Sequence, residues 1–493
     1  MVRARVSILS VDSQLRKAAN LKKKGKDVEA EAAYAKIVEA YPSNQRAIEG
    51  LRHIRVKPVL AALSNNRLVP THLRELIKLI DEGHLHDAAF AAQQLRNVFP
   101  DHAGLANICG VIHSKLENYE TAISCFEAAL NLEPDTASTH SNLGNALFDS
   151  GQSEKARAAF MRALDLDPSD KFATINLGRL LWSEGAFHDA RILFEKSHAM
   201  DPDNAMTLNN LGNVLIDLGQ FEKAIEVLND ALAKDETLWI GHKGLGLATL
   251  KLGRTDEALT HYRKALSLNP QAEEVAHMVA SLSGTQIKRA SPAYVENLFD
   301  GFANKFDTVL TENLQYQLPG EVAQILQRDM QAGRVSSLLD IGCGTGLLAP
   351  HVREMTQTLV GIDMSEKMLR YAAATGMYDE LVKVDVHDYL RGCQRRHDLL
   401  IALDVFIYIG EMDSFMTAVT ECCHDDALLV ISIETLDGSG FRLQQSGRFA
   451  HSDNYVEGCV TRNGLRIESR HKTILRTEKG QGVDGMVYFI RQK

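Results

Sequence analysis

Hydrophobic and polar residues in the first half of the chain follow a pattern that returns every 34 residues. Proline closes most of the units and glutamate one of them, at Pro100, Pro134, Pro168, Pro202, Glu236 and Pro270. From the second of these positions onward, each is preceded by a glycine, an alanine and a bulky apolar residue at fixed distances, as in Gly110, Ala122 and Phe126. The pattern predicts two short amphipathic helices per unit, which approach closely at the small residues and end at the proline.

The repeat resembles the tetratricopeptide repeat and fills residues 69–272 as six units. One outlying unit covers about residues 11–44, within a basic N-terminal helical segment that spans residues 1–68. Stacked units of this kind bury a continuous core and leave a concave groove. We therefore expect an α-helical solenoid whose groove holds a protein or peptide partner.

Three asparagines, Asn142, Asn176 and Asn210, occupy the same position in three successive repeats. A primary amide carries both donors and an acceptor, so a row of amides suits the backbone of an extended peptide whatever its sequence. The row resembles the asparagine ladder of O-linked N-acetylglucosamine transferase, which implies peptide binding by these residues. An equally weighted alternative is that the amides cap or bridge neighbouring helices.

From residue 334 onward the pattern changes to short apolar runs that alternate with helical segments. The predicted strands include Ser336–Ile341, Leu359–Asp363, Leu381–Val384, His397–Leu403, Leu465–His471 and Val487–Arg491. Strands and helices in alternation are typical of a doubly wound α/β fold with a parallel sheet. We therefore predict a Rossmann-like domain with a seven-stranded sheet over residues 334–493, preceded by linker and lid helices over residues 273–333.

Composition and charge narrow the class of protein. Hydrophobic residues make up 45% of the chain and charged residues 24%, as in an ordinary folded domain. The net charge is −10, and no basic face of the kind that phosphate contacts require is evident, so nucleic acid is not an expected partner. The sequence has no apolar run of about 18 residues and no signal peptide, so we expect no transmembrane segment and a cytoplasmic location.

The seven cysteines are scattered, at positions 109, 125, 343, 393, 422, 423 and 459. They form no C-x-x-C motif and no cysteine–histidine cluster with the spacing of a zinc site. We therefore expect reduced thiols and no metal.

A glycine-rich turn, with Gly342, Gly344 and Gly346, follows the first predicted strand. The third glycine of a dinucleotide-binding fingerprint would stand at Leu347, so that class of ligand is disfavoured. Asp340, two residues before the turn, would repel a pyrophosphate but attract a cationic amino-acid group. Glycine at the turn lets a ligand approach the backbone closely, because no Cβ intervenes.

An aspartate stands at the end of each of four consecutive predicted strands: Asp340, Asp363, Asp385 and Asp404. The carboxyl ends of parallel strands face one crevice, so these side chains are predicted to share a ligand site. Asp363 has the spacing from the glycine turn at which a carboxylate accepts both hydroxyls of a ribose. Asp385, with its neighbour Val386, is placed to bind an adenine.

Three motifs resemble those of class I S-adenosylmethionine-dependent methyltransferases: Leu338-Leu-Asp-Ile-Gly-Cys-Gly-Thr-Gly346, Val360-Gly-Ile-Asp-Met-Ser365 and Val384-Asp-Val386. Four further segments are similar to the bacterial tetratricopeptide-repeat methyltransferases, at residues 291–307, 378–381, 404–410 and 446–452. The resemblance implies S-adenosylmethionine as cofactor, with its amino-acid end at Asp340 and its ribose at Asp363. The cofactor-binding residues so implied are Asp340, Gly342, Gly344, Gly346, Asp363, Met364, Asp385, Val386, Asp404 and Phe302.

The resemblance also implies that residues 291–307 form a lid over the sulfonium, with the aromatic side chains Tyr294, Phe299, Phe302 and Phe306. Ordinary helix packing is the alternative for at least two of them. Pro350, early in the helix predicted from Leu347, is expected to kink that helix.

The candidate catalytic residues are Asp404, Tyr408 and His451. The first two follow the fourth strand, where the methyl acceptor is expected, and the segment with Arg448 and Tyr455 is a candidate substrate wall. His451 is a possible base for an oxygen or nitrogen acceptor. In the alternative, His451 and Ser452 simply open a predicted helix at residues 453–462.

Three functions are compatible with these patterns. The first is a methyltransferase whose repeats recruit a protein or peptide substrate or partner. The second is a methyltransferase for a small molecule or glycan, with repeats used for assembly. The third is a non-catalytic scaffold that senses the cofactor, which the intact set of four acids and three glycines disfavours.

Overall fold

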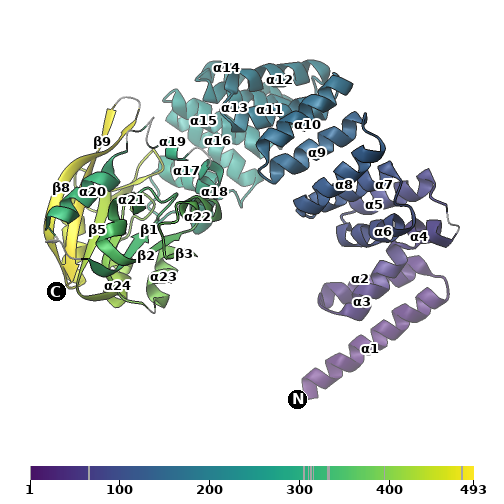
Figure 1. Cartoon of the computed structure of the whole chain (residues 1–493), viewed down its shortest axis with the longest axis horizontal. Helices are drawn as coiled ribbons and strands as arrows, with labels where there is room; N and C mark the ends of the chain where they lie inside the picture. Colours follow the sequence, from purple (N-terminus) through teal and green to yellow (C-terminus); the bar gives the residue numbers. More distant parts are fainter. Residues whose placement is uncertain are drawn as a thin grey trace. The chain divides into compact units, whose positions relative to one another are not determined.

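The computed structural model describes residues 2–64, 67–303, 306–308, 310, 314, 316–329, 334–393, 395–478 and 481–492. The chain divides into two compact units, Met1–Lys234 and Asp235–Lys493 (Figure 1). The domain boundaries predicted near residues 68, 272 and 333 follow sequence patterns and stay predictions. None of the described helices combines the length and the apolar character needed to cross a membrane.

The first unit consists of helices joined by short turns. Their bounds are α1 (Val2–Lys23), α2 (Asp27–Ala40), α3 (Gln45–Arg55), α4 (Lys57–Ser64), α5 (Pro70–Asp81), α6 (Leu85–Val98), α7 (Ala103–Lys115), α8 (Tyr119–Leu132), α9 (Ala137–Asp149), α10 (Ser153–Leu166), α11 (Lys171–Ser183), α12 (Phe187–Met200), α13 (Ala205–Asp217) and α14 (Phe221–Lys234). The first residues of α7, α9, α11 and α13 are 34 positions apart, at Ala103, Ala137, Lys171 and Ala205. The predicted helical repeat is thus confirmed.

The glycine of each repeat packs against the bulky residue of the same repeat. A Cβ on Gly110 would lie 2.4 Å from the ring of Phe126, and a Cβ on Gly144 would lie 2.6 Å from Phe160. Both rings are buried. The glycine is therefore required at this position because the ring occupies the volume that any larger side chain would need.

The second unit begins with helices and continues as an α/β domain. Its helices are α15 (Trp239–Lys251), α16 (Thr255–Leu268), α17 (Glu273–Ser283), α18 (Pro292–Phe302), α19 (Phe306–Thr308), α20 (Leu318–Asp329), α21 (Ala349–Val352), the 3₁₀ helix η3 (Arg353–Met355), α22 (Glu366–Ala374), α23 (Val386–Gly392), α24 (Asp413–Cys422) and α25 (Asp453–Arg462). Its strands are β1 (Val335–Ile341), β2 (Thr356–Asp363), β3 (Glu380–Lys383), β4 (His397–Ala402), β5 (Cys423–Thr435), β6 (Phe441–Leu443), β7 (Phe449–His451), β8 (Leu465–Glu478) and β9 (Gln481–Gln492).

The strands form one sheet, with a parallel core in the order β3-β2-β1-β4-β5. Strand β9 runs antiparallel to β5, and β8 pairs antiparallel with β9, which completes the predicted seven strands (Figure 1). Two short strands, β6 and β7, add a hairpin that the sequence pattern did not predict. Pairing between β4 and β5 stops at Ala402 and Ile431, and β7 pairs with β5 further along, at Glu434 and Thr435.

Apolar side chains cover both faces of the sheet. Leu338 packs with buried residues of α20, whereas its neighbour Leu339 shares a cluster with residues of α24 and α25. The alternation of strand side chains between faces therefore produces two cores on either side of one sheet. This three-layer arrangement is the predicted Rossmann-like fold, and it leaves the carboxyl ends of the parallel strands free for a site.

Three local predictions need correction. The helix after the glycine turn begins at Ala349, not Leu347, and Pro350 lies in its first turn, where a missing N–H costs nothing. The last two strands, β8 and β9, are longer than predicted, because their pairing continues as far as Glu478 and Gln481.

The expectation of seven reduced thiols is wrong for Cys393 and Cys422, which form a disulfide. Among the described residues, one group, Cys393, His397 and Cys422, places three potential metal-ligating atoms within 4.8 Å of one another. Two of these atoms are the bonded sulfurs, so in this form the group is not a thiolate site.

Candidate active site

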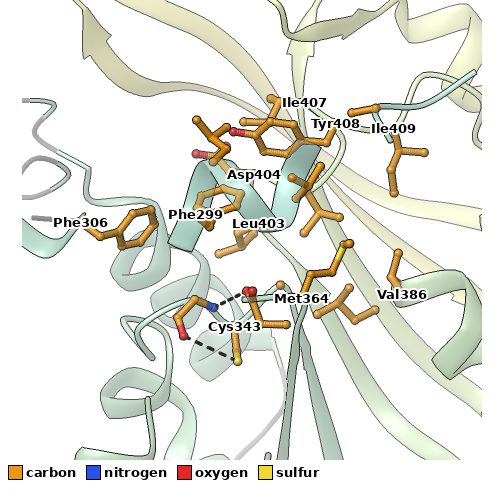
Figure 2. Close-up of a pocket in the computed structure, with 18 of the residues that line it drawn as sticks. Phe299, Phe306, Cys343, Met364, Val386, Leu403, Asp404, Ile407, Tyr408 and Ile409 are labelled. Carbon is orange, nitrogen blue, oxygen red and sulfur yellow. Dashed lines mark hydrogen bonds between the residues drawn. The ribbon is translucent and has the colours of Figure 1, made fainter. Parts of the chain in front are cut away.

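A cavity of about 480 Å³ lies at the carboxyl ends of β1, β2 and β4. All four strand-end aspartates, Asp340, Asp363, Asp385 and Asp404, line it. In Figure 2, Cys343 and Met364 lie on the lower side of this cavity, while Asp404 and Tyr408 lie on the upper side. The structure thus brings together residues that are separated by up to 64 positions in the sequence, at the edge of the sheet where the topology predicts a ligand site.

The glycine turn borders the cavity through two of its three glycines. Gly342 and Gly344 line the cavity with φ angles of 68° and 54°, a left-handed backbone that favours glycine. The amide of Gly344 donates to Asp363 Oδ2 over 3.0 Å, which holds the turn against the end of β2. Gly346, with φ 94°, is absent from the cavity wall and lies instead against the ring of Tyr378, so its local role is packing.

Asp340 is buried at the end of β1, and Tyr378 Oη donates to its Oδ2 over 2.6 Å. Burial raises the pKa of Asp340 to about 7, and the tyrosine hydrogen bond opposes part of that rise. Burial also raises the pKa of Asp363, although the carboxylate accepts from the amides of Gly344 and Ser365. Both carboxyl groups are therefore desolvated, and a bound cation would stabilise their charged forms.

Asp385 carries its charge throughout the neutral pH range. Burial raises its pKa, but the hydrogen bonds from His387 and the charge of Arg289 outweigh burial and hold the pKa well below its usual range. The guanidinium of Arg289 donates to both oxygens over 3.1 Å. Sequence patterns did not reveal Arg289, which reaches the site because residues 288–290 pair with residues 408–410.

Aromatic side chains close the cavity on the side of α18. Tyr294, Phe299 and Phe306 line it, and Phe299 meets Tyr408 edge to face with ring centres 5.5 Å apart (Figure 2). The side chain of Phe302, the fourth predicted lid aromatic, lies outside the described part of the chain. Met364 and Val386, two other predicted cofactor contacts, also line the cavity.

Asp404 follows β4 with a φ of 56°, which is uncommon for a residue other than glycine. Its amide donates to Ser432 Oγ over 2.8 Å, and Arg476 Nη1 lies 3.6 Å from its Oδ2. Burial raises the pKa of Asp404 to about 6, against the opposing effect of the Arg476 charge. A carboxylate with this pKa is ionised at neutral pH and basic enough to accept a proton.

His451 lies outside the cavity wall, contrary to its predicted role as a base. The residue is fully buried in β7, and its Nε2 lies 3.0 Å from the carbonyl oxygen of Gly410. Burial lowers its pKa to about 4. Ser452 caps α25 by accepting from the amide of Tyr455, so the structure favours the alternative in which these residues open the helix.

A group of buried charges surrounds the upper end of the cavity. Arg476 of β8 is 3% exposed, and its guanidinium contacts Glu434 and Glu478. Arg448 pairs with the same two glutamates. Of this group, only Arg448 was a candidate from sequence, because the others lie on strands whose alternation predicts ordinary faces of a sheet.

The three asparagines of the repeats differ in their contacts. Asn142 Nδ2 donates to Asn107 Oδ1 of the preceding repeat over 3.1 Å, which is the bridging arrangement. Asn176 Oδ1 accepts from Arg179 over 3.2 Å. Asn176 and Asn210 are each 8% exposed. Bridging therefore accounts for the first asparagine, and peptide binding stays a prediction for the row.

Comparison with known proteins agrees with the two-part fold. The family model described as "Methyltransferase domain" matches residues 339–429, which include the glycine turn and all four strand-end aspartates. Models described as "Tetratricopeptide repeat" match residues 12–44, 101–169, 141–205, 181–237 and 239–272.

Curated relatives named "Ubiquinone biosynthesis O-methyltransferase" match a part of the chain. The protein from Agrobacterium fabrum is 31% identical over 96 residues, which are 19% of this chain and 38% of that protein. The protein from Brucella anthropi is 28% identical over 98 residues, which are 19% of this chain and 40% of that protein. The chain therefore spans about 40% of the length of the curated relatives it matches.

Solved structures are similar to each part separately. Magnesium protoporphyrin IX methyltransferase from Synechocystis PCC 6803 with bound SAH is 17% identical, covers 36% of this chain and 82% of its own, and has a TM-score of 0.29. YrrB, a TPR protein with an unusual peptide-binding site, is 17% identical, covers 38% of this chain and 97% of its own, and has a TM-score of 0.33.

The protein is thus built from a helical repeat region and a Rossmann-like α/β domain. Its matches define those parts as tetratricopeptide repeats and a methyltransferase domain, so the chain is a tetratricopeptide-repeat protein with a methyltransferase domain.

Proposed function

We propose that the protein transfers a methyl group from S-adenosylmethionine to an oxygen of an acceptor that enters the cavity beside Asp404. The observation that carries the proposal is the convergence of four strand-end aspartates on one cavity, three of them suited to the cofactor and one to the acceptor. The names of the curated relatives, which are O-methyltransferases, support oxygen as the receiving atom.

The residues at the cavity fit this cofactor. The ammonium group of its amino-acid end is a cation, and Asp340 is a buried carboxyl whose only described hydrogen-bond donor is Tyr378. Gly344 lines the cavity with a φ of 54°, which favours glycine, so the turn presents no Cβ there. Met364 and Val386 supply the apolar contacts that a purine ring requires.

S-Adenosylmethionine supplies a methyl group on a positively charged sulfur, which is already activated for displacement. The chain therefore has to orient the acceptor in line with that methyl, exclude water and take up one proton. Phe299 and Tyr408 cover the cavity, and Asp404 accepts the hydroxyl proton. The O–H and S–CH₃ bonds break, the O–CH₃ bond forms, and the electron pair of the S–CH₃ bond stays on the sulfur of S-adenosylhomocysteine.

For the repeats we propose the recruitment of a protein or peptide partner. Stacked tetratricopeptide repeats generally leave a concave groove, and the amides of Asn176 and Asn210 lie at equivalent positions of adjoining repeats. Whether that partner is itself the methyl acceptor is decided by an assay with full-length protein and with a form that lacks residues 1–234, using labelled cofactor and cell lysate. Labelling of a protein band that requires the repeats supports a protein acceptor.

Calorimetric titration of S-adenosylmethionine into the full-length protein tests the proposal directly. We expect binding in the micromolar range for the wild type and at least a tenfold loss for Asp363→Ala, since two ribose hydroxyls lose their acceptor. Asp388→Ala, an exposed carboxylate on α23, is the matched control and should bind like the wild type. Absence of binding to the wild type at pH 8 would overturn the proposal.

A further inference from the structure

Three potential metal ligands meet at the amino end of β4, away from the candidate active site. Cys393 follows α23, His397 is the first residue of β4, and Cys422 is the last residue of α24. Among the described residues, the two sulfurs and one ring nitrogen of His397 lie within 4.8 Å of one another. Asp404, which lines the cavity, follows the carboxyl end of the same strand. The group is therefore separate from the cavity.

The two sulfurs are bonded to each other in this structure, and reduction makes them available as ligands. A dithiol supplies two electrons and two protons, so that the S–S bond breaks, two thiols form, and the dithiol itself becomes a disulfide. A cation that binds both sulfurs then displaces the two thiol protons. The reduced group offers two thiolates and one imidazole.

The spacing of the three atoms suits a tetrahedral ion. Zinc lies about 2.3 Å from a thiolate and about 2.0 Å from an imidazole nitrogen, so two ligands of one ion are roughly 3.5–3.8 Å apart. Separations of up to 4.8 Å reach this range through small changes in side-chain torsion angles. The fold thus places the ligands around one ion before the ion binds.

Hydrogen bonding prepares His397 for a metal. Its Nδ1 lies 2.8 Å from Ser337 Oγ, and both side chains are buried. Its Nε2 lies 3.4 Å from Tyr389 Oη, which is long for a hydrogen bond. When Nδ1 donates to Ser337, Nε2 carries the free lone pair. Histidine ligands almost always donate their other N–H to a fixed partner in this way, which sets the tautomer.

A backbone oxygen beside the sulfurs favours the reduced group. The carbonyl oxygen of Arg395 lies 2.7 Å from Cys393 Sγ and 3.8 Å from Cys422 Sγ. A disulfide has no proton to donate to this oxygen, whereas a thiol does. A cation between the sulfurs is attracted by the same carbonyl dipole. The contact therefore suits the dithiol and the metal-bound forms better than the disulfide.

The charges of the neighbouring side chains allow a divalent cation. The guanidinium of Arg395 pairs with Glu380 over 3.3 Å, and Arg396 donates to the carbonyl oxygen of Cys423 over 3.1 Å. Both arginines are thus held by partners of their own. The two thiolates balance the charge of one divalent ion, so the occupied site is neutral.

The donor atoms select the kind of metal. Thiolate and imidazole ligands favour zinc and disfavour magnesium, calcium and manganese, which prefer oxygen. Three protein ligands leave one position of a tetrahedral zinc ion for water. Cys422 and His397 are buried and Cys393 is partly exposed, so an ion has access from the side of Cys393.

We propose that Cys393, His397 and Cys422 bind one zinc ion when the two cysteines are reduced, and that the disulfide is the metal-free form of the same site. In the reverse direction a small disulfide takes up two electrons from the thiolates and two protons from water, and becomes a dithiol. The S–S bond of the protein forms again and the zinc ion leaves. This site is independent of the proposed methyl transfer.

Titration with zinc tests the proposal on the full-length protein in both redox forms. One sample is reduced with dithiothreitol, which is then removed under argon, and the other is left oxidised. In competition with a chromophoric chelator, the reduced protein should bind one equivalent of zinc that the oxidised protein does not bind. Cobalt in place of zinc should produce thiolate-to-metal charge-transfer absorption. Equal zinc binding by the two forms, or cobalt binding without that absorption, would overturn the proposal.

Variants assign the bound zinc to these residues. Cys393→Ser alters a partly exposed side chain and should weaken zinc binding at least about a hundredfold. Ser337→Ala should weaken it about tenfold, through the loss of the hydrogen bond to Nδ1. Cys423→Ser, next to Cys422 in the chain but outside the group, is the matched control and should bind zinc like the wild type.

Thermal denaturation gives a second measure that does not depend on the chelator. Zinc should raise the melting temperature of the reduced wild type and of Cys423→Ser, because it binds the folded form. It should leave the melting temperature of Cys393→Ser unchanged, and circular dichroism confirms that this variant is folded. Zinc that stabilises a folded Cys393→Ser protein as much as the wild type contradicts the assignment.

Discussion

The imidazole of His277 stacks on the ring of Tyr294, with ring centres 4.3 Å apart and 17° between the planes. His277 belongs to α17, and Tyr294 lines the cavity from α18. His277 Nε2 also donates to the carbonyl oxygen of Gly447 over 2.7 Å, at the turn that carries Arg448. The helix that follows the last repeat thus holds both the aromatic wall and the charged end of the candidate site.

Replacement of His277 should loosen these two parts of the site together. In His277→Leu we expect faster amide exchange in residues 441–451 and 292–301, because the hydrogen bond to Gly447 and the stacking on Tyr294 are both lost. Hydrogen-exchange mass spectrometry measures the effect. Glu273→Gln, an exposed change on the same helix, is the control. Unchanged exchange in both segments would show that α17 does not hold them.

Cofactor binding should depend on pH through Asp340. The pKa of this group in the free protein is about 7, and the cationic cofactor requires the ionised form. The affinity for S-adenosylmethionine should therefore increase from pH 6 to pH 8 and level off above that range. Titration calorimetry at several pH values gives the profile. A flat profile in the wild type would remove Asp340 from the cofactor site.

Tyr378 should set the midpoint of that profile. Its hydroxyl donates to Asp340 and lowers the pKa of that carboxyl, so Tyr378→Phe should move the midpoint to higher pH by about one unit. Tyr371→Phe, on an exposed tyrosine of α22, should leave the midpoint in place. Equal midpoints in all three proteins would contradict the assignment.

Asp340→Asn should stabilise the free protein while it weakens cofactor binding. Between about pH 4 and pH 7 the folded protein keeps a proton on Asp340 that the unfolded chain has lost, so unfolding releases a proton and stability falls as pH rises through this window. Asparagine does not titrate, so the variant avoids this decrease in stability. At pH 8 its free energy of unfolding should exceed that of the wild type by roughly 1–3 kcal/mol. Urea denaturation at pH 5 and pH 8 measures the gain, which should be smaller at pH 5. A destabilised variant at pH 8 would argue against a raised pKa.

The close packing within the repeats predicts that one added methyl group lowers the free energy of unfolding substantially. Gly110→Ala places a Cβ 2.4 Å from the ring of Phe126, and such overpacking costs about 1–3 kcal/mol. The double variant Gly110→Ala, Phe126→Leu should recover part of that stability, because the smaller side chain makes room. Thermal and urea denaturation provide the values. Additive losses in the double variant would show that the two residues do not share this contact.

Periodicity and strand alternation were sufficient to predict the two-part architecture. The repeat had a strict interval, and the strands of the core were apolar runs that ended in aspartate, as at Asp363 and Asp404. The hairpin of β6 and β7 escaped prediction because its strands span three residues each, too few for an alternation to show.

The candidate site was predictable where its residues follow strand ends and was missed where they come from elsewhere. Arg289 and Arg476 reach the cavity from a linker and from the long strand β8, and their partners are 96 and 72 positions away in the sequence. No local pattern carries such a pairing. His451 was a candidate base because it follows the fifth strand, where a substrate wall is expected, with helix opening as the alternative; the fold surrounds its ring with Phe406, Phe441 and Tyr455.

The contact between Gly110 and Phe126 lies inside one repeat, and the same is true of Gly144 and Phe160. From Gly110 to Tyr262, each repeat therefore contains both residues of its own glycine contact, and neither residue comes from the repeat before or after it. Duplication or deletion of a whole 34-residue segment in this region preserves every such contact. Evolution can for this reason change the length of the solenoid in whole repeats, at the level of gene rearrangement, without redesigning the packing within those that remain.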